Sequence, residues 1–119
     1  MTKKQYYQIC DQMKNYTEKI NDIRDTILKH AAVKCIYLFG SYAYGEPNED
    51  SDIDVYVITQ DKITNYMELY TKIIGDLGHK KIFFIDLILS SNDDFNDRKS
   101  RYILERIVCD KGILLYGHI

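Results

Sequence analysis

The stretch LFGSYAYGEPNEDSDIDVYVI, residues 38–58, joins a Gly-Ser turn to a strand pattern that contains two alternating aspartates. A strand over residues 52–59 places Asp52 and Asp54 on the same face, because successive side chains point to opposite faces. Their carboxylates then lie about 6.6 Å apart at about 3.3 Å per residue, close enough to bind one cation or a pair of cations. The opposite face carries the apolar side chains Ile53, Val55 and Val57. We therefore expect one face of this strand to be core and the other acidic.

The Gly-Ser pair stands where a strand over residues 33–39 ends and a short helix over residues 41–45 begins. Gly40 allows a sharp turn and a close approach of the backbone to a ligand. The hydroxyl of Ser41 and the first free N–H groups of the helix suit phosphate oxygens. An ordinary helix N-cap is the simpler interpretation of this pair alone. Its combination with the two aspartates favours a phosphate site.

A third aspartate, Asp86, interrupts the apolar run KIFFIDLIL at residues 81–89. This run predicts a strand that is buried on both faces. An ionised carboxylate buried there costs several kcal/mol unless a partner compensates it. A neighbouring Lys or Arg is the structural explanation, and a metal site shared with Asp52 and Asp54 is the functional one. Ligands that are all oxygen favour Mg²⁺ or Mn²⁺, and two such ions about 3.5–4 Å apart suit in-line displacement at phosphorus.

The composition predicts one compact domain. The chain has 119 residues, of which 45% are hydrophobic and one is proline, so we expect a single domain over 1–119 with an N-terminal helix (1–30) and a core (31–117). No apolar run approaches the ~20 residues of a membrane span, and the N-terminus lacks the apolar stretch of a secretory signal, which predicts a cytoplasmic protein without a membrane partner. The net charge of −2 argues against direct nucleic-acid binding. The three cysteines have neither zinc-site spacing nor an even number, so we expect reduced thiols.

Hydrophobic periodicity predicts a small mixed β-sheet with helices packed against it, an α/β or α+β fold. The expected helices cover residues 2–30, with Thr2 as N-cap, 63–76 and 94–109, and Gly112 caps the last of them. A helix of about 26 residues would be ~39 Å long, more than a domain of this size can cover. Its apolar stripe is expected to pack on the domain's own sheet, and part of it could meet a second subunit in a homo-oligomer or a partner helix.

The segment GSYAYGEPNEDSDID, residues 40–54, resembles the signature of the minimal nucleotidyltransferases in the DNA polymerase beta-like superfamily. That signature is Gly-Ser, ten residues, Asp-x-Asp and a third aspartate on a later strand. Gly40-Ser41, Asp52-Ile53-Asp54 and Asp86 match it in order and spacing. The resemblance spans roughly residues 30 to 117 and implies the polymerase beta-like nucleotidyltransferase fold.

The resemblance also implies a reaction and a role for each matching residue. Asp52 and Asp54 would bind two Mg²⁺ ions that hold the triphosphate of ATP, and Asp86 would complete the metal site and take the proton from an acceptor hydroxyl. Gly40 and Ser41 would bind the nucleotide. AMP would pass from ATP to the hydroxyl, with release of pyrophosphate.

One departure from the family pattern concerns the phosphates. Many relatives carry Arg where this chain has Tyr44. A nearby lysine, Tyr44 itself or a partner protein could supply what that cation does, or catalysis could be less efficient.

Short members of the family resemble the antitoxin of a two-component system, in which the nucleotidyltransferase adenylylates a helical HEPN toxin, an RNase. This is the leading hypothesis for the chain. A small-molecule nucleotidyltransferase of the aminoglycoside type, working as a dimer, is one alternative. A non-catalytic antitoxin that only binds its partner is the other. A neighbouring gene for a small helical protein with an Arg-x4-6-His motif would favour the toxin partner.

Overall fold

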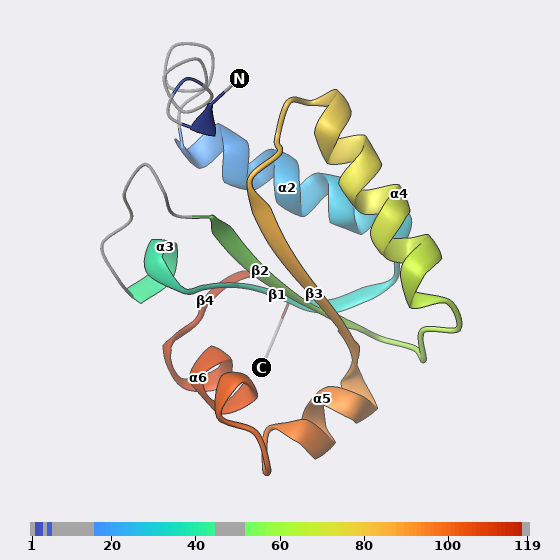
Figure 1. Cartoon of the computed structure of the whole chain (residues 1–119). Coiled ribbons are helices and arrows are strands. Elements are labelled where there is room, and N and C mark those ends of the chain that lie inside the picture. The colour runs from blue at the N-terminus through green and yellow to red at the C-terminus, as the bar shows by residue number, and fades with distance from the viewer. Residues whose placement is uncertain (1, 4, 6–15, 45–51, 118–119) are drawn as a thin grey trace.

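A four-stranded mixed sheet forms the centre of the computed structural model, which describes residues 2–3, 5, 16–44 and 52–117 (Figure 1). The strands are β1 (Val33–Phe39), β2 (Ile53–Thr59), β3 (Ile85–Ser91) and β4 (Ile113–Gly117). Their order across the sheet is β3-β2-β1-β4. β1 is antiparallel to both β2 and β4, and β2 is parallel to β3. The predicted mixed sheet is confirmed.

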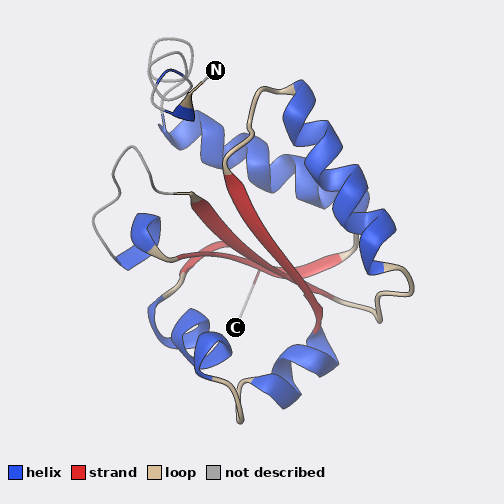
Figure 2. Cartoon of the chain, in the orientation of Figure 1, coloured by secondary structure: helices blue, strands red, loops and turns tan. Residues whose placement is uncertain are grey.

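Helices cover both faces of this sheet (Figure 2). They are α2 (Tyr16–His30), α3 (Ser41–Tyr44), α4 (Tyr66–His79), α5 (Asn92–Arg98) and α6 (Ile103–Lys111). α2 and α4 lie side by side on one face, and α5 and α6 lie on the other. Of the described residues, none belongs to a helix long and apolar enough to cross a membrane.

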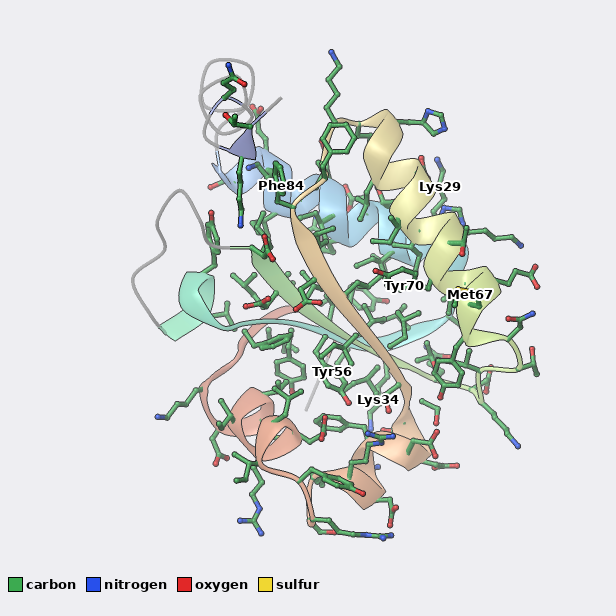
Figure 3. All side chains as sticks on the ribbon, in the orientation of Figure 1. Lys29, Lys34, Tyr56, Met67, Tyr70 and Phe84 are labelled. Atoms are coloured by element: carbon green, nitrogen blue, oxygen red, sulfur yellow. The ribbon has the colours of Figure 1, made fainter. Side chains whose placement is uncertain are left out.

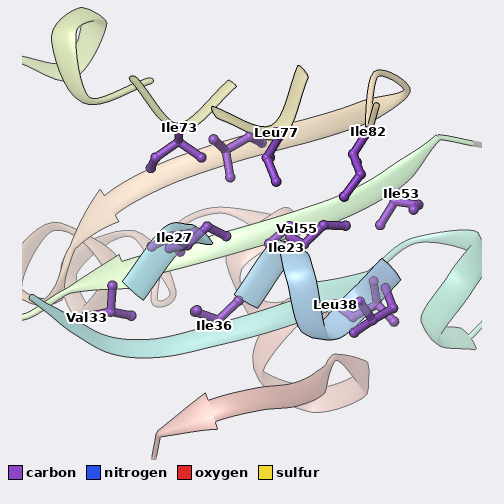
Figure 4. Packing of buried hydrophobic residues seen from close by; sticks show 13 residues of the cluster. Ile23, Ile27, Val33, Ile36, Leu38, Ile53, Val55, Ile73, Leu77 and Ile82 are labelled. Atoms are coloured by element: carbon purple, nitrogen blue, oxygen red, sulfur yellow. The ribbon is translucent and has the colours of Figure 1, made fainter. Parts of the chain in front are cut away.

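The larger core lies between the sheet and the pair α2 and α4 (Figure 4). The α2 side chains Ile23 and Ile27 are fully buried there, so the part of the predicted stripe that lies in α2 packs on the domain's own sheet. The register of β1 shifts between Val33 and Cys35. This irregularity explains why Val33 faces the same core as Ile36, three residues later, rather than alternating strictly.

The predicted N-cap at Thr2 is confirmed. The Gln5 N–H donates to the Thr2 hydroxyl at 3.2 Å, and the Gln5 side-chain oxygen accepts from the Thr2 N–H at 2.8 Å. These reciprocal bonds form a capping box, which satisfies two N–H groups at the start of a helix. The predicted helix also covers residues 6–15, which lie outside the described residues.

The second core fills the space between the sheet and the pair α5 and α6. The predicted single helix over 94–109 is wrong, because the chain leaves the helical conformation between α5 and α6 and Tyr102 is extended (φ −113°, ψ 139°). Phe95 and Val108 both pack in this core. In one straight helix they would lie about 20 Å apart along the axis, so the break lets both reach the sheet.

This second core also corrects the expectation that one face of β2 is acidic throughout. Tyr56 and Ile58 lie on the same face as Asp54, and they are buried under α5 and α6. The acidic part is therefore confined to the start of β2, beyond the reach of these two helices.

The prediction that residues 81–89 form a strand buried on both faces is also wrong. β3 begins at Ile85 and is an edge strand, and Phe83 is 54% exposed. Asp86 is exposed as well, so it needs no buried countercharge. The helix expected over 63–76 lies three residues later, because the Asn65 side chain accepts from the Glu68 N–H at 3.0 Å and caps α4.

Candidate active site

The predicted site residues lie where β1 ends and where β2 and β3 begin. Asp54 on β2 pairs with Phe39, the last residue of β1, and with Asp86 on β3. Because β2 and β3 are parallel neighbours in this register, the two aspartates project from the same face at adjacent positions. The sequence interpretation that grouped them is supported by this geometry, although it assumed a buried strand for Asp86.

Gly40 lies directly against Asp54. A Cβ atom at Gly40 would overlap the Asp54 Oδ2 atom, and the φ of Gly40 is +69°. Both facts require glycine, the first by space and the second by backbone conformation. The Gly40 carbonyl accepts from the Ala43 N–H at 3.0 Å at the start of α3. The turn thereby brings backbone within contact distance of the carboxylate, as the sequence predicted for a close approach.

Asp52 lies one residue before β2 and its side chain is 49% exposed. The Lys3 ammonium donates to its Oδ1 atom at 2.6 Å. The next residue, Ile53, donates its N–H to the Phe84 carbonyl at 3.1 Å, which ties the start of β2 to the segment before β3. Asp52 therefore stands at the open rim of the site, beside the chain's N-terminal segment.

The carboxylates of the site act on one another. The pKa of Asp54 is raised from its ordinary value of 3.8 to about 6, first by burial and then by the negative charges of Asp86 and Asp52. Lys3 acts in the opposite direction and lowers it. Because neighbouring negative charges help to raise this pKa, a cation that joins the cluster would stabilise the ionised form of Asp54. Shifts of this kind are common at functional sites, and reasoning from the sequence did not predict this one.

The donor set suits a hard divalent cation, because all of its side-chain donors are carboxylate oxygens. Within the described ranges, however, no three acidic, histidine or cysteine side chains already surround one point. The three aspartates are neighbours, but their carboxylates are not arranged as a complete set of metal ligands. A cation would have to draw their side chains together.

Two predicted residues are only partly described. Ser41 opens α3 at its expected place after Gly40, but its side chain lies outside the described part of the structure, as does that of Tyr44. Sequence reasoning did not single out Lys3, because it lies 49 positions before Asp52 and belongs to no motif. A general expectation of a nearby lysine was the only signal for it.

Comparison with known proteins gives the family. Residues 21–117 match the polymerase beta nucleotidyltransferase family. The chain is 34% identical over 84 residues to a protein of Methanocaldococcus jannaschii whose name describes a protein adenylyltransferase, and the match covers 71% of this chain and 79% of that protein.

Two solved structures share the fold. One is a toxin-antitoxin structure with AMP-PNP (TM-score 0.62, 26% identity, 83% of this chain and 73% of that chain). The other is the tri-AMPylated HEPN toxin of Shewanella oneidensis in complex with an MNT antitoxin (TM-score 0.55, 27% identity, 86% and 72%). With the matching segment covering most of the sequence, the chain belongs to the polymerase beta nucleotidyltransferase family.

Proposed function

We propose that this chain is a Mg²⁺-dependent protein adenylyltransferase, which moves AMP from ATP to a hydroxyl group of a partner protein and releases pyrophosphate. The observation that carries the proposal is the arrangement of Asp54. It lies against the Gly40 turn, pairs with Asp86 across two parallel strands, and has its pKa raised by burial and then by the charges of Asp86 and Asp52. Such a cluster suits a nucleotide that arrives with divalent cations.

In this proposal Asp52 and Asp54 would hold Mg²⁺ through their carboxylate oxygens, and Asp86 would complete the donor set. Bound Mg²⁺ would neutralise charge on the triphosphate and make the α-phosphorus open to attack. The backbone at Gly40 and the hydroxyl of Ser41 would hold phosphate oxygens next to Asp54. Its neighbour Gly40 would keep that approach open, because any larger residue would displace the carboxylate.

Asp86 would also take the proton from the acceptor hydroxyl. Its side chain is exposed and lies on an edge strand, so a hydroxyl on the surface of another protein can reach it. The exposure of Asp86 is therefore compatible with a macromolecular acceptor.

The partner that we propose is a HEPN-type helical toxin, with this chain as the antitoxin that adenylylates and neutralises it. Support comes from the relatives: the Methanocaldococcus protein carries the name of a protein adenylyltransferase, and the Shewanella structure contains a tri-AMPylated HEPN toxin with an MNT antitoxin. The identities of 34% and 27% make a shared activity a reasonable proposal.

The test is transfer of α-labelled ATP with Mg²⁺ into an extract of the host cell, with the wild type beside the Asp52→Asn/Asp54→Asn double variant. Asparagine keeps the size of both side chains and removes the charges that bind the metal. We expect label on one protein band with the wild type and none with the variant. Equal labelling by both proteins would place the activity elsewhere, and no labelling by either would favour a small-molecule acceptor or a purely binding antitoxin.

A further inference from the structure

We propose that Lys3 binds a phosphate oxygen of the nucleotide while it keeps its contact with Asp52, so that the N-terminal segment forms part of the nucleotide site. This inference rests on the proposed function, since it requires a nucleotide at Asp52. Lys3 precedes residues 21–117, the part of the chain that matches the family, so the family match assigns it nothing.

Several contacts hold Lys3 at the site. The Thr2–Gln5 capping box joins a residue before Lys3 to a residue after it. Its ammonium is 2.6 Å from Asp52 Oδ1 and 5.4 Å from the centre of the Phe84 ring. Phe84 comes just before β3, on the side of the molecule where residues 2–3 and the start of β2 also lie (Figures 1 and 3). The Lys3 side chain is only 23% exposed, so this cation is packed in place rather than loose in solvent.

The charges of the proposed complex call for a cation here. Three carboxylates and a triphosphate together carry more negative charge than two divalent ions neutralise. Lys3 lowers the pKa of Asp54 as well as pairing with Asp52, so its charge already acts on more than one member of the cluster. A bound triphosphate would add negative charge beside the same ammonium.

The distance to the phosphates follows from the geometry of Mg²⁺ sites. Oxygen ligands at adjacent positions around Mg²⁺ lie about 3 Å apart, because each metal–oxygen bond is about 2.1 Å. An ammonium in contact with Asp52 would therefore be within reach of a phosphate oxygen, provided that this oxygen and the carboxylate bind one ion at adjacent positions. Lysine has three N–H donors, so it can donate to both oxygens at once.

The experiment compares Lys3→Met and Lys3→Arg with the wild type in two binding measurements. One is the affinity for Mg²⁺-ATP by calorimetry, and the other is the affinity for Mn²⁺ alone by electron paramagnetic resonance. Lys72→Met is the matched control, because Lys72 forms an exposed ion pair with Glu68 at 2.9 Å, away from the site. Loss of one charge-assisted hydrogen bond should weaken Mg²⁺-ATP binding by Lys3→Met about tenfold.

The pattern across variants identifies the role. Lys3→Arg should restore most of the nucleotide affinity, Lys72→Met should match the wild type, and the affinity of Lys3→Met for Mn²⁺ alone should not fall, because the removed group is a cation. An equal loss of Mn²⁺ affinity would show that Lys3 only orients Asp52. Unchanged or tighter Mg²⁺-ATP binding would also overturn the proposal, since Lys3 would then be a surface pair or a competitor of the metal.

Failure of this inference and failure of the proposed function are distinguishable. If the wild type binds Mg²⁺-ATP but labels no protein, adenylyl transfer to a protein fails and the comparison of Lys3 variants still decides the role of Lys3. If the wild type binds no Mg²⁺-ATP, both proposals fail together.

Discussion

Gly40 and Asp54 form a single unit at the residue scale, because the carboxylate occupies the space that a side chain at position 40 would need. The positive φ of Gly40 adds a second constraint. A motif that the sequence presents as two separate signals, a glycine and an aspartate 14 positions later, is therefore one contact in the folded chain.

The substitution Gly40→Ala should damage both stability and nucleotide binding. Strain at the positive φ should lower the free energy of unfolding by about 1–3 kcal/mol, and the displaced Asp54 carboxylate should weaken Mg²⁺-ATP binding. Gly75→Ala is the control, because a Cβ at this exposed α4 position meets nothing within 4 Å. It should stabilise the chain by about 0.5–1 kcal/mol, as alanine does in a helix. Urea unfolding measures the stability of both variants, and calorimetry measures their affinity for Mg²⁺-ATP. Equal effects of the two substitutions would contradict the contact between Gly40 and Asp54.

Asp54 should make the nucleotide-free chain less stable as pH rises. Its pKa is about 6 in the folded chain, against 3.8 ordinarily, so between these values the folded state binds more protons than the unfolded state. Stability from this group is therefore lost as pH rises through that window. Asp54→Asn should raise the unfolding midpoint at neutral pH, with a gain that shrinks as pH falls below about 6. A gain that does not change with pH would show that ionisation of Asp54 is not its cause.

At the scale of elements, a buried polar contact fastens α6 to the sheet. The Tyr56 hydroxyl on β2 donates to the Glu105 carboxylate at 3.1 Å, and both residues are buried, at 1% and 4% exposed (Figure 3 labels Tyr56). Burial is the main reason why the pKa of Tyr56 is raised. Tyr56 is two residues after Asp54 on the same strand, so this contact lies close to the site.

Removal of this hydroxyl by Tyr56→Phe should cost about 1–3 kcal/mol of stability, because it leaves a buried carboxylate without its donor. The comparison is Tyr102→Phe, which changes a tyrosine that is 52% exposed and should leave stability unchanged. Denaturant midpoints give the difference. If Tyr56→Phe is also neutral, the contact with Glu105 does not stabilise α6.

Elements whose local signals are strong could be predicted from the sequence. β1 has the predicted bounds, and the apolar stripe of α2 faces the predicted core. The errors arise where tertiary packing decides. The break before Tyr102 serves two contacts with the sheet, and the exposure of Asp86 follows from the place of β3 at the edge, neither of which is encoded in local periodicity.

At the scale of the whole molecule, the fold gathers segments that are far apart in the sequence at one edge of the sheet. The end of β1, the starts of β2 and β3, and Lys3 meet there. The spacing motif predicted the first three, because the resemblance assigns the glycine, the paired aspartates and the third aspartate to one site. Lys3 could not be predicted, since an isolated lysine carries no pattern and its partner is defined only by the folded chain.

The central claim, that this edge of the sheet transfers adenylyl groups to a protein, is tested most directly by the position of the label. Host-cell extract with Mg²⁺ and the wild-type chain is given ATP labelled either at the α-phosphorus or at the γ-phosphorus. The account predicts one protein that carries label from the α position alone, because pyrophosphate leaves with the γ-phosphorus. Label from the γ position would indicate phosphorylation and contradict the account.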